Sequence, residues 1–197
     1  MTLFLVRHGA TEQNQRGLLL GSRADPDLAE EGRAQAQALA RSLARHPEAT
    51  IVSSPMRRCL ETAETIAEVI GSDVIVEDRL VEIDYGEWEG VSLAEIPIET
   101  SERWRADASF RPPGGETLEE VACRVAAWCE EVDGGSDVIA VTHVSPVKGV
   151  VAWALGAPAT VAWRLFVSVA SITTIGIHPY GPVLLAFNDT GHLHPTP

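Results

Sequence analysis

The sequence predicts an α/β fold, a three-layer αβα sandwich with a mainly parallel central sheet. Short apolar runs rich in β-branched residues alternate along the chain with segments whose apolar residues recur at helical spacing. Two of these runs end directly in Arg7-His8 and in His143, and parallel α/β sheets bind ligands beyond the carboxyl ends of their strands. A length of 197 residues suits one core, so we expect a single domain over 1–197.

The first part of the chain predicts three strands and two helices. Thr2–Val6 reads as a buried strand, and a first helical pattern follows the turn at 25–27. A second helix is expected after Ser54-Pro55, where Ser54 can serve as the N-cap, and it should end at Gly71. The expected strands span 2–6, 50–53 and 74–76, and the expected helices span 28–43 and 56–70.

The second part of the chain opens with an acidic and aromatic loop over 79–90. A weakly helical stretch interrupted by Pro97 and a Pro/Gly turn come next, and we expect them to form a small cap over the site at about 92–113. Thr117 and Glu120 have the spacing of a capping box at the start of a helix. The remaining predicted elements are helices over 117–131 and 145–155 and strands over 137–142, 165–169, 172–177 and 183–187, the last two as a hairpin.

The formal charge of -13 argues against nucleic acid or an anionic membrane surface as a partner, because no basic stripe relieves it. No apolar run reaches the roughly 18 residues needed to span a bilayer, and the N-terminus lacks a charged leader. The three cysteines form no CxxC pair, and we interpret Cys123 and Cys129 as core residues of a helix. We therefore expect a cytoplasmic protein.

His8 can be interpreted in two ways. A single histidine at a strand end is most often a hydrogen-bonded structural residue. A neutral imidazole can also attack phosphorus, and here Arg7 would attract the anionic group while Gly9 would let backbone N–H groups approach it. These three residues alone do not decide between the two interpretations.

A series of ordered motifs narrows the choice. The motifs are RHGATEQN at 7–14, DPDL at 25–28, SSPMRRCLETA at 53–63, LVEIDYGEWEG at 80–90, GGET at 114–117 and VTH at 141–143. Together they resemble the histidine phosphatase superfamily, which has the phosphoglycerate mutase-like fold. NDTGHL at 188–193 is similar to the tail of its short phosphatase members. The resemblance covers residues 3 to about 145 and the tail.

The resemblance implies a catalytic role for five residues. His8 would accept the phosphoryl group covalently, and Arg7, Arg58 and His143 would hold that group. Phosphoryl transfer spreads negative charge over three equatorial oxygens, so converging forked donors and an imidazole suit it. Glu82 would protonate the leaving oxygen and later activate water. Judged from the residues alone, any carboxylate of the loop could do this, namely Glu82, Asp84, Glu87 or Glu89.

The resemblance also implies substrate contacts. Asn14 matches a phosphate-contacting asparagine, and Gly21 follows Leu20 where cofactor-dependent mutases have a small polar residue before the glycine. Val144 replaces a usual glycine and should narrow the pocket. Five further residues would help to choose the leaving group, or would only pack or form salt bridges: Trp88, Arg103, Trp104, Arg105 and Arg111.

These observations predict a metal-independent phosphatase that hydrolyses small phosphomonoesters through a phosphohistidine, with no cofactor. One alternative is a cofactor-dependent phosphoglycerate mutase, and the short cap argues against it because a mutase must keep water from its intermediate. A second alternative is an inactive module that binds a phosphorylated ligand. A metal site built from His8, His143 and the loop carboxylates lacks the short-range ligand spacings that such sites show. The expected partner is a small phosphorylated metabolite, and the sequence leaves open whether the protein is a homodimer.

Overall fold

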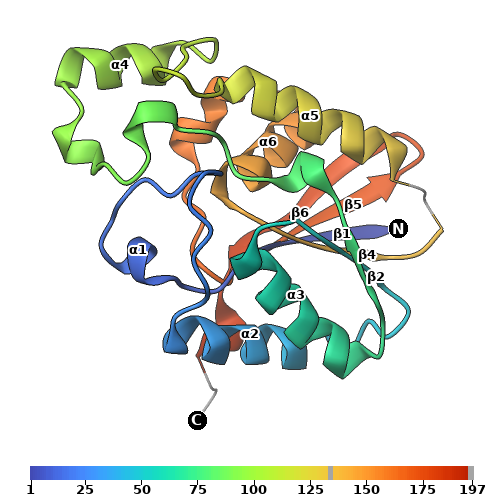
Figure 1. Ribbon diagram of the computed structural model, residues 1–197. Coiled ribbons are helices and arrows are strands. Elements are labelled where there is room, and N and C mark those ends of the chain that lie inside the picture. The colour runs from blue at the N-terminus through green and yellow to red at the C-terminus, as the bar shows by residue number, and fades with distance from the viewer. Residues whose placement is uncertain (133–134, 195–197) are drawn as a thin grey trace.

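The fold is built on a single sheet, seen in a computed structural model that describes residues 1–132 and 135–194. Six strands lie in the order β3-β2-β4-β1-β5-β6 (Figure 1). The pairs β3–β2, β2–β4 and β4–β1 are parallel, whereas β5 and β6 run antiparallel to their neighbours. The strands are β1 (Thr2–Arg7), β2 (Thr50–Ser53), β3 (Val74–Val76), β4 (Val138–Thr142), β5 (Ile172–His178) and β6 (Gly181–Asp189).

Helices cover both faces of the sheet. In Figure 1, α2 and α3 lie on one side of the strands, α5 and α6 lie on the other, and α4 stands apart in a peripheral segment. The helices are α1 (Glu12–Gln15), α2 (Glu30–Leu43), α3 (Arg57–Ile70), α4 (Ile98–Ala106), α5 (Leu118–Glu131) and α6 (Val144–Leu155). The predicted three-layer α/β fold with a mainly parallel sheet is therefore confirmed.

The alternation of side chains along β1 explains the two layers of core. Leu3 and Leu5 belong to the cluster formed with α5 and α6, whereas Phe4 and Val6 belong to the cluster formed with α2 and α3. Successive strand residues point to opposite faces, so one apolar run contributes to both cores. Each fully buried side chain of this kind contributes about 1.5–3 kcal/mol relative to exposure.

Several local predictions are confirmed. Thr117 caps α5, and the reciprocal bonds between Thr117 and Glu120 form a capping box. Gly71 ends α3 in the left-handed conformation with φ 79°, which glycine adopts without steric cost. The hairpin of β5 and β6 turns at Pro179-Tyr180.

Three local predictions are wrong, and one short helix was missed. Residues 165–169 form no strand, because β5 already occupies the edge of β1 and Val167 is instead buried in the core as irregular chain. Ser54 is not the cap of α3, which begins at Arg57 after Met56, so the Ser54 hydroxyl is left for other partners. Cys123 is exposed, whereas Cys129 is buried as expected. The short helix α1 was not expected from the sequence; Thr11 caps it.

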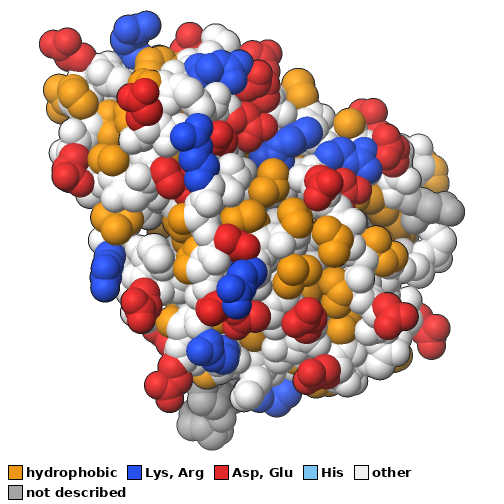
Figure 2. Space-filling model, in the orientation of Figure 1, with side chains coloured by type: hydrophobic (Ala, Val, Ile, Leu, Met, Phe, Trp, Pro, Cys, Tyr) orange, Lys and Arg blue, Asp and Glu red, His pale blue; other side chains and the backbone are white. Residues whose placement is uncertain are grey.

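The surface carries both signs of charge. On the face shown in Figure 2, the carboxylates and the arginines are interspersed. Within the part of the chain that the structure describes, no helix is long and apolar enough to cross a membrane.

Candidate active site

The ends of β1 and β4 bring the two predicted histidines together. The strands are parallel neighbours with Arg7 opposite Thr142, so the next residue on each strand is a histidine. The His8 backbone N–H donates to the Thr142 carbonyl at 3.0 Å. The rings of His8 and His143 lie 5.1 Å apart in an edge-to-face arrangement, and both side chains are buried.

One hydrogen bond sets the chemical form of His8. Its Nδ1 lies 2.7 Å from the Gly9 carbonyl oxygen. A carbonyl can only accept, so Nδ1 carries the proton and Nε2 keeps a lone pair. Gly9 is itself held in place, because its N–H donates to the Thr62 hydroxyl at 3.2 Å. The Nε2 atom of His8 is thus left with a free lone pair.

Burial and neighbouring positive charge keep both imidazoles neutral. The pKa of His8 is lowered well below 6.5, first by burial and then by the charges of Arg7 and Arg58. Burial likewise lowers the pKa of His143, with Arg58 and His8 adding to the effect. His143 therefore acts as a hydrogen-bonding group here rather than as the cation that the sequence left open.

The two arginines are held by backbone carbonyls. Arg7 donates from Nη1 to the Val167 carbonyl at 2.7 Å, and burial lowers its pKa to about 10, which still leaves it charged at neutral pH. Arg58 is fully buried and donates to the carbonyls of Gly21 at 2.9 Å and Ala24 at 3.1 Å. The Nε atoms of both arginines are buried without a partner among the described residues. Both guanidinium groups thus keep donor capacity for an anion.

Two side chains that sequence reasoning missed fix the second imidazole. The Ser54 hydroxyl lies 2.9 Å from His143 Nε2, and the thiol of Cys59 lies 3.3 Å from the same nitrogen. Cys59 is buried, and burial raises its pKa far above its usual range, so it remains a thiol. The position of Ser54 at the end of β2, next to the end of β4, was the available signal.

Glu82 lies against the first turn of α6. Its Oε2 accepts the N–H of Val144 at 3.1 Å, and its Oε1 accepts the N–H groups of Ser145 at 3.1 Å and Ile83 at 2.9 Å. The first N–H groups of a helix lack intrahelical partners, so a carboxylate there satisfies them. The carboxylate is buried and is bonded to the backbone of the two residues that follow His143 in sequence.

The three predicted substrate contacts have different surroundings. Asn14 uses its Oδ1 to accept from the N–H and the hydroxyl of Thr11, which leaves its amide nitrogen as the group able to reach a ligand. Gly21 is buried behind Arg58, and a Cβ there would lie 2.5 Å from the Ile83 carbonyl oxygen. Its carbonyl orients Arg58, a role that the sequence did not suggest. Val144 lines a cavity beside Glu82.

Most of the predicted leaving-group residues are engaged elsewhere. The guanidinium groups of Arg103 and Arg105 lie over the rings of Phe110 and Trp163 at 5.7 and 5.6 Å. The exposed Arg111 pairs with Glu120, and Trp88 packs in an aromatic cluster with Phe110 and Trp104. Among the five, Trp104 lines the cavity next to the site.

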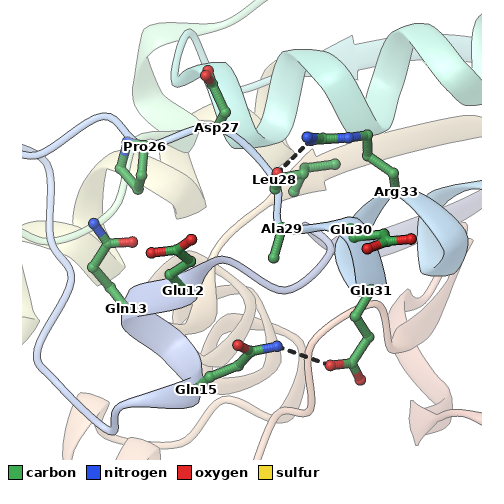
Figure 3. A pocket seen from close by; sticks show the side chains of 10 residues that line it. All are labelled: Glu12, Gln13, Gln15, Pro26, Asp27, Leu28, Ala29, Glu30, Glu31 and Arg33. Carbon is green, nitrogen blue, oxygen red and sulfur yellow. Dashed lines mark hydrogen bonds between the residues drawn. The ribbon is translucent and has the colours of Figure 1, made fainter.

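A second cavity, near α1, is larger than the one that Val144 lines, but its negative charge does not suit a phosphate. It measures about 580 Å³ and is lined by four carboxylates and one arginine, Glu12, Asp27, Glu30, Glu31 and Arg33 (Figure 3). The arginine side chain donates to the Leu28 carbonyl, as the dashed line in the figure shows. Among residues 1–132 and 135–194, no group of three or more His, Cys, Asp and Glu is arranged to hold a metal ion.

A family model agrees with the arrangement of these residues. The model of the histidine phosphatase superfamily (branch 1) matches residues 3–190. The chain belongs to this superfamily.

Two named proteins are similar in sequence to nearly the whole of this chain. Phosphoserine phosphatase 1 of Hydrogenobacter thermophilus is 36% identical, with 97% of this chain and 93% of that protein covered. Bifunctional protein Rv2228c of Mycobacterium tuberculosis is 38% identical over 97% of this chain but only 54% of its own length. The chain thus spans about half the length of that relative.

Solved structures of the superfamily superimpose closely. A mycobacterial glucosyl-3-phosphoglycerate phosphatase has a TM-score of 0.87 and 31% identity, with 96% of this chain and 99% of that chain covered. A mutant phosphoserine phosphatase from Entamoeba histolytica, in complex with phosphoserine, has a TM-score of 0.90 and 26% identity, with 98% and 99% covered.

Proposed function

We propose that this histidine phosphatase hydrolyses small phosphomonoesters without a metal ion or cofactor, through a phosphohistidine on His8. One observation carries the proposal. The bond from His8 Nδ1 to the Gly9 carbonyl leaves Nε2 unprotonated within a buried group of positive donors. Such a nitrogen is poised to attack phosphorus, and two of the similar proteins reported above are a phosphoserine phosphatase and a glucosyl-3-phosphoglycerate phosphatase.

The first step transfers the phosphoryl group to the enzyme. The lone pair of His8 Nε2 forms a bond to phosphorus while the bond from phosphorus to the ester oxygen breaks. Arg7, Arg58 and His143 stabilise the charge on the equatorial oxygens. The departing oxygen takes a proton from Glu82 and leaves as an alcohol.

The second step releases phosphate. Glu82, now a carboxylate, takes a proton from water, and the water oxygen attacks phosphorus as the bond to Nε2 breaks. Inorganic phosphate leaves, while Glu82 is again protonated and His8 neutral. Because one carboxyl group serves both steps, its fixed position against the first turn of α6 matters to each of them.

The wider setting follows from the same proposal. Residues 1–197 would form one phosphatase domain, with the segment at about 92–113 as its cap, and the protein would act in the cytoplasm on a phosphorylated metabolite. Asn14 would contact the transferring phosphate through its amide nitrogen, and Val144 would border the leaving group. A homodimer is a separate prediction, which analytical ultracentrifugation would test.

Rapid quenching with a radiolabelled phosphomonoester tests the proposal. We expect covalent label on the peptide that contains His8, no label in His8→Asn, and turnover that persists in a chelator. Glu82→Gln should lower kcat by about 10²-fold or more, whereas the loop control Glu87→Gln, at an exposed carboxylate, should not. Activity abolished by the chelator would refute the proposal. So would conversion of 3-phosphoglycerate to 2-phosphoglycerate without free phosphate, which identifies a mutase.

A further inference from the structure

A cavity of about 170 Å³ adjoins the proposed phosphate site. It shares Val144 and Ser145 with the environment of Glu82, since both residues line the cavity and both donate backbone N–H bonds to that carboxylate. The group leaving from phosphorus departs toward Glu82, which protonates it. The cavity is therefore placed to hold the leaving group, and its other walls include Leu19, Tyr85, Trp104 and Trp163.

Lys148 supplies the one ammonium group of this largely apolar cavity. It is the only lysine among the 197 residues. Within the described ranges, its ammonium group has neither a hydrogen bond nor a salt bridge to a carboxylate. A partly buried cation without an anionic partner loses hydration without compensation. An anion bound in the cavity would supply that partner.

The helix directs Lys148 toward the reaction. It lies one turn after Val144 on α6, and the side chains of a helix lean toward its N-terminus, where Glu82 is bound. Burial lowers the pKa of Lys148, while the charge of Glu82 opposes that change and the charge of Arg7 adds to it. Both active-site charges therefore act on this ammonium group.

Two other polar groups of the cavity wall are also donors. The indole N–H groups of Trp104 and Trp163 are buried and have no partner in the part of the chain that is described. The two rings pack edge to face with centroids 4.6 Å apart, so their positions are mutually fixed. An indole nitrogen can only donate, as can an ammonium group. The cavity thus matches a ligand rich in acceptor oxygens.

We propose that this cavity selects the leaving group of a phosphorylated hydroxy acid, whose carboxylate pairs with Lys148. The proposal rests on the phosphatase function proposed above and names its substrate class. The small volume favours a leaving group of few carbon atoms, since sites for larger ligands measure roughly 300–1,000 Å³. An amino-acid ester fits less well, because its ammonium group would add a second positive charge beside Lys148.

Three phosphate esters of one size test this selectivity. 3-Phosphoglycerate carries the carboxylate, glycerol 3-phosphate replaces it with a hydroxymethyl group, and phosphoserine replaces the hydroxyl with an ammonium group. We expect kcat/KM for 3-phosphoglycerate to exceed that for glycerol 3-phosphate by about tenfold or more, as expected for one charge-assisted hydrogen bond. It should also exceed that for phosphoserine, which keeps the carboxylate but brings its ammonium group close to Lys148. Lys148→Met should collapse the ratio mainly through KM for 3-phosphoglycerate, and Lys148→Arg should retain most of it.

The outcomes separate the two proposals. If the wild type hydrolyses none of these esters and no chromogenic phosphomonoester, the phosphatase function fails. If the wild type hydrolyses the esters but its kcat/KM values for 3-phosphoglycerate and glycerol 3-phosphate are nearly equal, only the role of Lys148 is refuted. The same holds if Lys148→Met keeps the wild-type ratio of these two values.

Chemical labelling provides a readout that does not depend on turnover. An amine reagent can modify only Lys148 and the N-terminal amine, so peptide mass spectrometry resolves the two. In His8→Asn, which should not consume either ester, 3-phosphoglycerate should protect Lys148 at least fivefold, glycerol 3-phosphate should protect it little, and Met1 should serve as the internal control. Equal protection by the two esters would overturn the proposal.

Discussion

The buried imidazoles should make the stability of the protein depend on pH in a defined window. Because the folded state holds His8 and His143 neutral, the unfolded chain binds more protons below its histidine pKa of about 6.5. The free energy of unfolding should therefore fall as the pH falls below about 6.5 and be fully retained above it. At pH 5.5, one unit below the unfolded pKa, each neutral imidazole costs about 1.4 kcal/mol, or about 3 kcal/mol for the pair.

Urea unfolding at pH 7.5 and pH 5.5 measures this loss. Other groups titrate as well, so the pH-dependent loss of the wild type is compared with that of the double variant His8→Gln/His143→Gln. Any change that the substitutions make in stability at both pH values cancels when the loss between pH 7.5 and pH 5.5 is taken. We expect the variant to lose about 3 kcal/mol less than the wild type. His178→Gln, at an exposed histidine, is the matched control and should behave like the wild type. An equal loss in the double variant and the wild type would refute the argument that the imidazoles are held neutral.

Three further substitutions probe the supports of the site. Ser54→Ala removes the hydroxyl that orients His143 and should lower kcat about fivefold with little change in stability; unchanged kcat would exclude that role. Gly21→Ala places a Cβ 2.5 Å from the Ile83 carbonyl oxygen and should lower both the free energy of unfolding, by about 1–3 kcal/mol, and phosphate affinity, as denaturation and inhibition assays would show. Thr117→Ala removes a helix cap remote from the chemistry and should cost about 1 kcal/mol of stability at constant kcat/KM.

The elements that repeat a simple period were predictable from the sequence. Buried strands and amphipathic helices can be recognised from the spacing of their apolar residues. Two of the strands carry His8 and His143 at their ends, so the proximity of the two rings followed from the predicted topology. Residues 165–169 show the limit of this reasoning. Val167 is buried and its carbonyl holds Arg7, whereas Phe166 beside it is exposed, and nothing local distinguishes such a loop from an edge strand.

Roles that depend on distant partners were not predictable. Ser54 has the chemistry of a helix cap, and only the neighbouring end of β4 makes it a partner of His143. Lys148 is one polar position in an apolar helix, and the residues that surround it include Tyr85, Leu93 and Trp104, which are far away in sequence. The resemblance suggested that Gly21 contacts the substrate, but it did not suggest that the Gly21 carbonyl holds Arg58.

The position of β1 in the sheet has a consequence for synthesis on the ribosome. The strand that leads to His8 is made before the other strands of the sheet, yet its two hydrogen-bonding neighbours are β4 and β5, which pair Leu3 with Val138 and with Ile175. A nascent chain therefore carries an apolar segment with two open edges until β4 and β5 have emerged, and such segments aggregate readily. Premature stop codons before β5 should accordingly yield insoluble fragments rather than weakly active ones.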